Sequence, residues 1–144
     1  MIPTIGEMLA GSAGRVPERQ ALVCDDQELS YRELNARVNQ IVHGFFKFGI
    51  TGGDRVALLL YNSVELAVLL MGLARAGIVG IPLNYRLHPR ELSAVLSQSG
   101  ATVLFVGKEL ESVFNALDPV PHSIRSVIRI ETAPVKGSGF YGLC

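Results

Sequence analysis

The stretch over residues 53–107 constrains the fold most, because short apolar runs alternate in it with helix-like runs. The first apolar run, residues 55–60, is nearly continuous, which favours a strand in a parallel sheet covered on both faces. Further strands are predicted over residues 78–83, 102–106 and 126–130. Alternation of this kind predicts right-handed crossovers and a mostly parallel sheet with helices on both faces. The predicted fold class is α/β.

Helix starts are marked by a polar residue with a glutamate three positions later. Ser30 with Glu33 has this capping-box spacing, and so does Asn62 with Glu65. Apolar residues recur three or four positions apart after Ser30, which indicates an amphipathic helix that Gly49 stops. The helix that Asn62 opens is apolar almost all round, as expected for a helix packed between layers.

The remaining elements follow from turn and cap signals. Residues 20–24 and 28–29 flank a turn-rich link and predict a short hairpin. Pro89 suits a first helical turn, and the helix it starts runs to about Ser99, with His88 as its cap. A short helix is predicted over residues 109–117. Three helices are predicted to end in a left-handed glycine followed by a non-polar residue, at Gly49-Ile50, Gly77-Ile78 and Gly100-Ala101.

Composition excludes several classes of protein. Thirteen basic and thirteen acidic residues give a formal charge of zero, and no Lys/Arg block could neutralise several phosphates in a row, so nucleic acid is not an expected partner. Cys24 and Cys144 have no second Cys or His at metal spacing, which predicts no metal site and no disulfide framework and fits a reducing cytoplasm. The longest apolar run, residues 66–74, is far shorter than the ~20 residues of a transmembrane helix.

The residues that resemble catalytic groups have structural explanations. His43 lies within an amphipathic helix, His88 is a helix cap, and His122 follows a proline-rich link; none has a Ser or Cys partner or an orienting carboxylate. Cys24 is predicted to be a small buried hydrophobe in a strand. The pair Asp54-Arg55 is interpreted as a turn before a buried strand.

The segment from Gly137 to Gly142 formally matches the dinucleotide fingerprint G-x-G-x-x-G. That fingerprint requires the glycines to lead into a helix whose amino terminus faces pyrophosphate. Only Leu143 and Cys144 follow here, too few to build the helix, so we interpret the match as false.

Three segments contain a family pattern: LSYRELNARVNQIVHGFFKFGI, GDRVALLLYNSVELAVLLMGLARAGIVGIPLN and HPRELSAVLSQSGATVLFV. In this order and at this spacing they resemble the adenylate-forming superfamily, which includes acyl-CoA synthetases, firefly luciferase and peptide-synthetase adenylation domains. The stretch PLNYRLHPREL is more similar to acyl- or aryl-CoA ligases than to peptide-synthetase domains, which tend to show an Asp-Pro and a Tyr-Pro there. Tyr61 replaces a proline common in the family, a change that we interpret as neutral because it precedes a helix cap.

The resemblance implies a two-step reaction with ATP, CoA and Mg2+. A carboxylic acid attacks ATP to give acyl-adenylate and pyrophosphate, and the CoA thiol then displaces AMP. Joining a carboxylate to a polyphosphate calls for a metal, a lysine and backbone donors. The family motifs that supply these groups all lie beyond residue 144, so we assign no catalytic residue and no metal ligand.

By the same resemblance, Arg86 lies where some CoA ligases place an arginine that contacts a CoA phosphate. It belongs to the run Asn84-Tyr85-Arg86-Leu87, and a guanidinium suits a phosphate contact. The alternative is that Arg86 makes only a salt bridge at a loop or helix edge.

The leading hypothesis is therefore the amino-terminal subdomain of a ligase that joins CoA to a fatty or aromatic acid. Residues 1–133 are expected to be that part of the domain, and residues 134–144 a disordered or frameshifted tail. The 144-residue chain alone is expected to be inactive and to bind none of the cofactors tightly. Two alternatives stay open: a scaffold that docks onto a full-length ligase through a sheet edge, and a small nucleotide-binding α/β protein.

Overall fold

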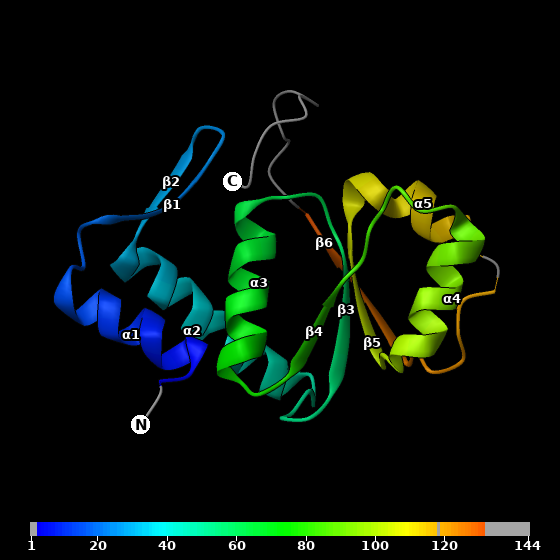
Figure 1. The fold of residues 1–144 in the computed structure, drawn as a ribbon, viewed down its shortest axis with the longest axis horizontal. Coiled ribbons are helices and arrows are strands. Elements are labelled where there is room, and N and C mark those ends of the chain that lie inside the picture. The colour runs from blue at the N-terminus through cyan, green and yellow to red at the C-terminus, as the bar shows by residue number, and fades with distance from the viewer. Residues whose placement is uncertain (1–2, 118, 132–144) are drawn as a thin grey trace. The chain divides into compact units, whose positions relative to one another are not determined.

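A computed structural model describes residues 3–117 and 119–131 of the chain. These residues form two compact units (Figure 1). One takes the residues up to Gly52 together with Asn62–Ile78, and we call it the helical unit. The other takes Gly53–Tyr61 and the residues from Val79 onward, and we call it the sheet unit. Each unit is described by itself.

The helical unit contains three helices and a hairpin. Its elements in chain order are α1 (Ile5–Arg15), β1 (Gln20–Cys24), β2 (Gln27–Ser30), α2 (Tyr31–Lys47) and α3 (Val64–Arg75). Strands β1 and β2 are antiparallel, with Cys24 opposite Gln27, and Asp25 at the turn has a positive φ of 51°. The predicted hairpin is confirmed. Helix α1 was not among the predicted elements.

The capping box that starts α2 is confirmed. The Glu33 amide donates to Ser30 Oγ (3.3 Å), and the Ser30 amide donates to Glu33 Oε2 (2.8 Å). Helix α1 starts with the same reciprocal pair, formed by Thr4 and Glu7. This signal was present in the sequence, and it would have predicted the missing helix.

The predicted start of α3 is wrong by one residue. The N-cap is Ser63 rather than Asn62, and its Oγ accepts a hydrogen bond from the Leu66 amide (3.1 Å). Counting from Ser63, Glu65 is the second helical residue. It therefore lies one position too early for the return bond of a capping box, which requires the third residue.

The predicted glycine stops are confirmed by positive φ angles of 74°, 68° and 64° at Gly49, Gly77 and Gly100. After the first two, the next amide reaches back five residues: Ile50 donates to the Phe45 carbonyl and Ile78 to the Leu73 carbonyl, both at 2.9 Å. This is the bond that closes a Schellman motif. After Gly100 the pattern differs, because the Ala101 amide donates to the Ser99 hydroxyl (3.2 Å).

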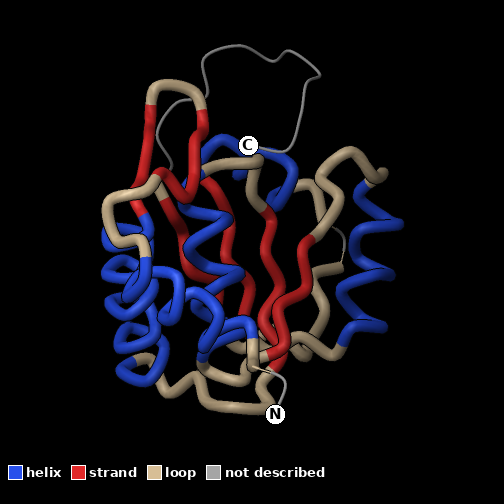
Figure 2. The backbone as a smooth tube through the Cα atoms, turned by 60° about the vertical axis from the view of Figure 1, so that its left-hand side comes forward, coloured by secondary structure: helices blue, strands red, loops and turns tan. Residues whose placement is uncertain are grey.

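The sheet unit is a four-stranded parallel sheet in the order β4-β3-β5-β6. Figure 2 draws its strands in red. Its elements in chain order are β3 (Arg55–Leu59), β4 (Val79–Pro82), α4 (Pro89–Ser99), β5 (Val103–Gly107), η1 (Lys108–Leu110), α5 (Glu111–Asn115) and β6 (Ser126–Ile130). The predicted parallel α/β sheet is confirmed. The helix predicted over residues 109–117 is a 3-10 turn followed by the short α5.

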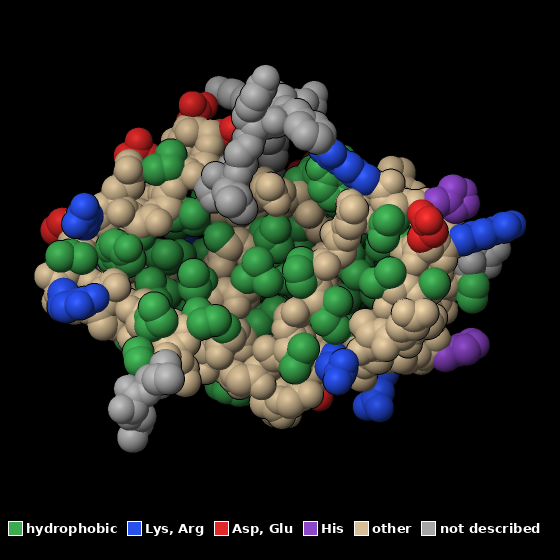
Figure 3. Space-filling view, in the orientation of Figure 1, with side chains coloured by type: hydrophobic (Ala, Val, Ile, Leu, Met, Phe, Trp, Pro, Cys, Tyr) green, Lys and Arg blue, Asp and Glu red, His purple; other side chains and the backbone are tan. Residues whose placement is uncertain are grey.

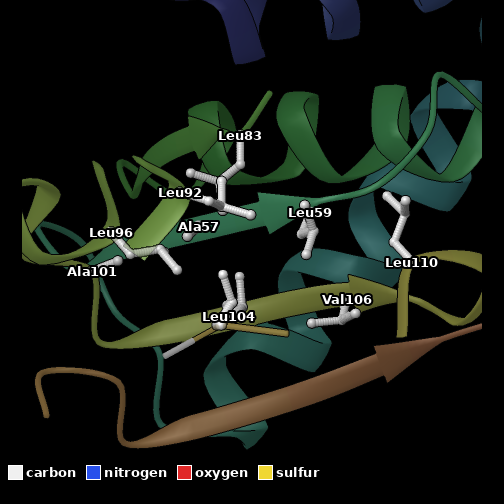
Figure 4. Packing of buried hydrophobic residues seen from close by; sticks show 10 residues of the cluster. Ala57, Leu59, Leu83, Leu92, Leu96, Ala101, Leu104, Val106 and Leu110 are labelled. Atoms are coloured by element: carbon white, nitrogen blue, oxygen red, sulfur yellow. The ribbon is translucent and has the colours of Figure 1, made fainter. Parts of the chain in front are cut away.

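One face of the sheet packs against α4 and the segment that follows β5 (Figure 4). The inward residues of β3 and β5 alternate, as period-two strands require. They meet a row of leucines, and the buried cluster consists of Ala57, Leu59, Leu83, Leu92, Leu96, Ala101, Leu104, Val106, Leu110 and Leu117. The intervening residues Val56, Leu58, Val103 and Phe105 are buried as well. Both central strands are therefore buried on both faces, which explains their unbroken apolar runs.

Candidate functional site

The carboxyl ends of all four strands lie at one edge of the sheet unit, since the strands are parallel. In open α/β sheets, ligands bind at this edge. Polar or aromatic residues follow each strand there. They are Tyr61 after β3, Asn84 to Arg86 after β4, Lys108 after β5 and Glu131 after β6.

The segment after β4 is a closed turn from Asn84 to Leu87. Asn84 makes two hydrogen bonds: its carbonyl accepts from the Leu87 amide, and its Oδ1 accepts from the Arg86 amide, both at 3.1 Å. Asparagine is favoured in turns because its side chain can bond to the backbone two residues on. The turn is anchored to the sheet by Leu83, whose amide donates to the Leu58 carbonyl (2.9 Å). Tyr85 and Arg86 are consequently the central residues of a fixed turn.

Helix α4 begins directly after this turn. Pro89 is its first residue, and His88 caps it: His88 Nδ1 accepts from the Arg90 amide (3.3 Å), while the His88 amide donates to Glu91 Oε2 (2.9 Å). The predicted structural role of His88 is confirmed.

Two tyrosines from neighbouring strand ends are in contact at this edge. The rings of Tyr61 and Tyr85 meet edge to face, with centroids 4.7 Å apart and an interplanar angle of 87°. Both rings are half-buried and pack against the apolar cluster of the sheet unit. The Arg86 side chain is exposed, and its Cζ lies 5.7 Å from the centroid of the Tyr85 ring. We expected the replacement of proline by Tyr61 to have no effect, but the tyrosine ring has a specific aromatic partner.

Two further cations at the carboxyl edge are paired with carboxylates. Lys108 Nζ lies 3.0 Å from Glu131 Oε1, and its hydrogen bond with this carboxylate raises the pKa of the lysine. Arg129 Nε lies 2.8 Å from Glu111 Oε1, and its guanidinium also lies over the Phe114 ring. These pairs balance positive charge with negative charge. On the face shown in Figure 3, basic side chains do not gather into one patch.

The other sequence-derived candidates lie away from this edge. His43 is exposed on α2, and His122 is exposed before β6. Cys24 is buried, as predicted. Arg55 begins β3, and its Nη1 donates to the Ser99 carbonyl (2.9 Å) at the end of α4. The segment from Gly137 to Gly142 lies outside the described residues.

Within residues 3–117 and 119–131, no three His, Cys, Asp or Glu side chains gather closely enough to hold a metal ion. No helix in that part of the chain combines the length and apolar character that a membrane crossing requires. Arg86 thus stays the single predicted ligand-binding residue, and its phosphate contact stays a prediction.

Comparison with known proteins identifies relatives over nearly the whole chain. The model of the family described as AMP-binding enzyme matches residues 9–141. FadD13 of Mycobacterium tuberculosis, a long-chain-fatty-acid-CoA ligase, is 40% identical over 115 residues, which are 78% of this chain and 23% of that protein. A 3-hydroxybenzoate-CoA/4-hydroxybenzoate-CoA ligase of Thauera aromatica is 32% identical over 134 residues, 90% of this chain and 24% of that protein.

The fold has solved counterparts as well. The N-terminal domain of FACL13 from Mycobacterium tuberculosis superposes with a TM-score of 0.84 at 36% identity, covering 90% of this chain and 34% of that one.

The chain spans about a quarter of the length of the curated relatives it matches. The family match extends to residue 141, into the segment 134–144 that we predicted to be a tail. That segment lies outside the described residues, and its assignment stays a prediction.

Proposed function

The chain belongs to the AMP-binding enzyme family, and on this premise we propose that it is the amino-terminal part of an ATP-dependent acid-CoA ligase. In the proposed reaction, a carboxylic acid displaces pyrophosphate from ATP to form an acyl-adenylate. The CoA thiol then displaces AMP to form acyl-CoA. The observation that supports this most is the 40% identity with a long-chain-fatty-acid-CoA ligase over 115 residues.

The proposed substrate is a fatty acid. The 40% identity with the fatty-acid ligase exceeds the 32% identity with the hydroxybenzoate ligase, which favours an aliphatic chain over an aromatic ring. The intact enzyme would use ATP, CoA and Mg2+. We propose no catalytic residue within this chain.

Within this function, we propose that Arg86 contacts a phosphate of CoA. The residue is exposed, lies at the carboxyl edge of the sheet, and sits on a turn held closed by two hydrogen bonds that Asn84 accepts. A guanidinium offers five donors in a planar fork that matches phosphate geometry. Because the turn fixes the Arg86 backbone before CoA binds, less conformational entropy is lost on binding.

The first experiment is to read the gene past the codon for Cys144. A continuous frame that encodes a Gly/Ser/Thr-rich loop ending in lysine would support the proposal, and its product is called the intact ligase below. That product should release pyrophosphate only when a fatty acid is added and should then form acyl-CoA. A continuous frame without such a loop, or a product that does not activate fatty acids, would contradict the proposed function.

The second experiment compares Arg86→Ala with Arg90→Ala in the intact ligase. Arg90 is also exposed and lies four residues away, which makes it a matched control. A hydrogen bond to a charged group contributes about 1.5–3 kcal/mol, and exposure places this one at the low end. The KM for CoA should therefore rise about tenfold for Arg86→Ala and stay unchanged for Arg90→Ala. Fatty-acid-dependent release of pyrophosphate, which precedes CoA, should not change in either variant.

The 144-residue chain itself should show no acid-dependent release of pyrophosphate, because the groups that position the carboxylate and polyphosphate are not among its residues. Release in step with added acid would overturn this expectation.

A scaffold role is the second candidate. In the described part of the chain, β6 pairs only with β5, so its outer edge has unpaired backbone groups that another strand can use. Tagged chain should then co-purify with a full-length ligase from the same cells. Recovery of the chain without a ligase would remove this candidate.

A further inference from the structure

We propose that Tyr85, held by Tyr61, positions the Arg86 guanidinium for its phosphate contact. This inference rests on the proposed function and adds two positioning residues to it. It concerns the affinity for CoA and not the activation of the acid.

The turn alone does not place the charged group. The two hydrogen bonds that Asn84 accepts hold the backbone of Tyr85 and Arg86, but the guanidinium lies at the end of a long side chain with several rotatable bonds. A long side chain that is left to rotate loses conformational freedom when it binds, and this loss weakens the contact. A second point of attachment near the guanidinium would reduce that loss.

The Tyr85 ring supplies such a point. Arg86 Cζ lies 5.7 Å from the ring centroid, inside the distance of about 6 Å over which a cation is attracted to an aromatic face. This attraction acts on the charge of the guanidinium and uses none of its N–H donors. The ring can therefore hold the group without competing with phosphate for hydrogen bonds.

The Tyr85 ring is in turn held by Tyr61. The edge-to-face contact, at 4.7 Å and 87°, joins the residue after β3 to the residues after the neighbouring β4. Edge-to-face pairs are favoured because the positive ring edge meets a negative ring face. Both rings also pack against the buried apolar cluster of the sheet unit. Only Arg86 of the three is exposed, so a rigid, half-buried aromatic base supports one exposed cation.

The nearby carboxylate of Glu91 does not point to a different role for the turn. Its Oε2 accepts a hydrogen bond from the His88 amide (2.9 Å) as part of the α4 cap. Of the carboxylates that follow the strands, Glu111 pairs with Arg129 and Glu131 pairs with Lys108.

The test measures the KM for CoA in variants of the intact ligase. An exposed cation-aromatic contact corresponds to a two- to fivefold change in affinity, so Tyr85→Leu should raise the KM for CoA about two- to fivefold. Leucine keeps the apolar volume and removes the ring face. Tyr85→Phe keeps the face and should retain the wild-type KM. Tyr61→Leu should have a smaller effect in the same direction, and acid-dependent release of pyrophosphate should be unchanged throughout.

A double-mutant cycle separates positioning from general packing. If Tyr85 acts through Arg86, Tyr85→Leu should change the KM for CoA little when Arg86 is already alanine. A wild-type KM in Tyr85→Leu, together with a raised KM in Arg86→Ala, would refute the positioning role and leave the proposed function standing. An unchanged KM in Arg86→Ala would refute the phosphate contact itself, and the positioning role with it.

A measurement on the 144-residue chain covers the case in which Tyr85→Leu disturbs folding of the ligase. The proton on Arg86 Nε should show a ring-current shift in the NMR spectrum, because the guanidinium lies above the Tyr85 face. The shift should persist in Tyr85→Phe and vanish in Tyr85→Leu. An Arg86 resonance that is the same in all three proteins would overturn the proposal.

Discussion

Replacing Gly72 by alanine tests a close contact between α3 and α2 in the helical unit. Gly72 is buried within α3, and a Cβ atom built on it would lie 2.5 Å from Ile41 Cγ2 and 3.2 Å from Phe45 Cε2, both on α2. Non-bonded carbon atoms prefer separations of about 3.5–4.0 Å. Ile41 Cγ2 is bonded directly to a branched Cβ, so it cannot move away unless χ1 rotates or the helices shift.

Two effects of opposite sign determine the magnitude. Alanine favours the helix over glycine by about 1 kcal/mol. Overpacking a close-packed core costs about 1–3 kcal/mol, and the upper half of that range applies because Ile41 is stiff and Phe45 is only 1% exposed. The free energy of unfolding should therefore fall by about 1–2 kcal/mol. For a chain of this length, Tm should fall by about 3–8 °C.

Gly44→Ala is the matched control, because Gly44 is also helical and a Cβ atom built on it meets nothing within 4 Å. This variant should raise the free energy of unfolding by up to about 1 kcal/mol. Urea unfolding followed by circular dichroism measures both changes. Equal stability of the two variants would show that the helices separate at no cost. Ile41→Ala should recover part of the loss when combined with Gly72→Ala, with a coupling of about 0.5–2 kcal/mol.

Three further predictions concern helix ends and the helical unit. Ser63→Ala should lower the free energy of unfolding by about 1 kcal/mol in urea titrations, whereas Asn62→Ala should change it little. A larger loss in Asn62→Ala would instead support Asn62 as the N-cap of α3. Arg75→Lys should lower the free energy of unfolding by about 1–2 kcal/mol, because lysine cannot reproduce the guanidinium contacts with the Gly6 carbonyl and two asparagines of α2. Wild-type stability of this variant would show that these contacts contribute nothing. The Ser30 amide and hydroxyl hold the pKa of Glu33 below its usual value, so its stabilising effect is present above about pH 4.5 and is lost as pH falls through the lower folded-state pKa. Thermal melts should show a weaker dependence on acid in Glu33→Gln, and an unchanged dependence would argue against the cap.

The elements that could be predicted are those whose signals are local. A capping box such as Ser30 with Glu33 joins residues three positions apart, and a glycine stop such as Gly49 depends on one backbone angle. Both are determined within a single helical turn, so neighbouring residues suffice to predict them. The parallel sheet followed from apolar runs in the same way, since burial on both faces removes polar residues from a strand.

The errors also have local causes. Helix α1 was missed although Thr4 and Glu7 form the same capping box as the predicted helix. At α3, Asn62 and Ser63 are both good caps, and the sequence pattern does not show which of two adjacent residues takes the extended backbone that a cap requires. The structure gives that conformation to Ser63.

Contacts between distant residues needed the tertiary structure. The strand order β4-β3-β5-β6 brings residues 61 and 85 to neighbouring strand ends, and only then do the two tyrosines meet below Arg86. Arg75 bonds to the Gly6 carbonyl 69 positions earlier in the chain, and Gly72 is required where two helices cross closely. Sequence by itself determined the type and limits of most elements and the family pattern, because these depend on neighbouring residues. Tertiary structure decided the partners of each side chain, because packing joins residues whose separation along the chain contains no information about their distance in space.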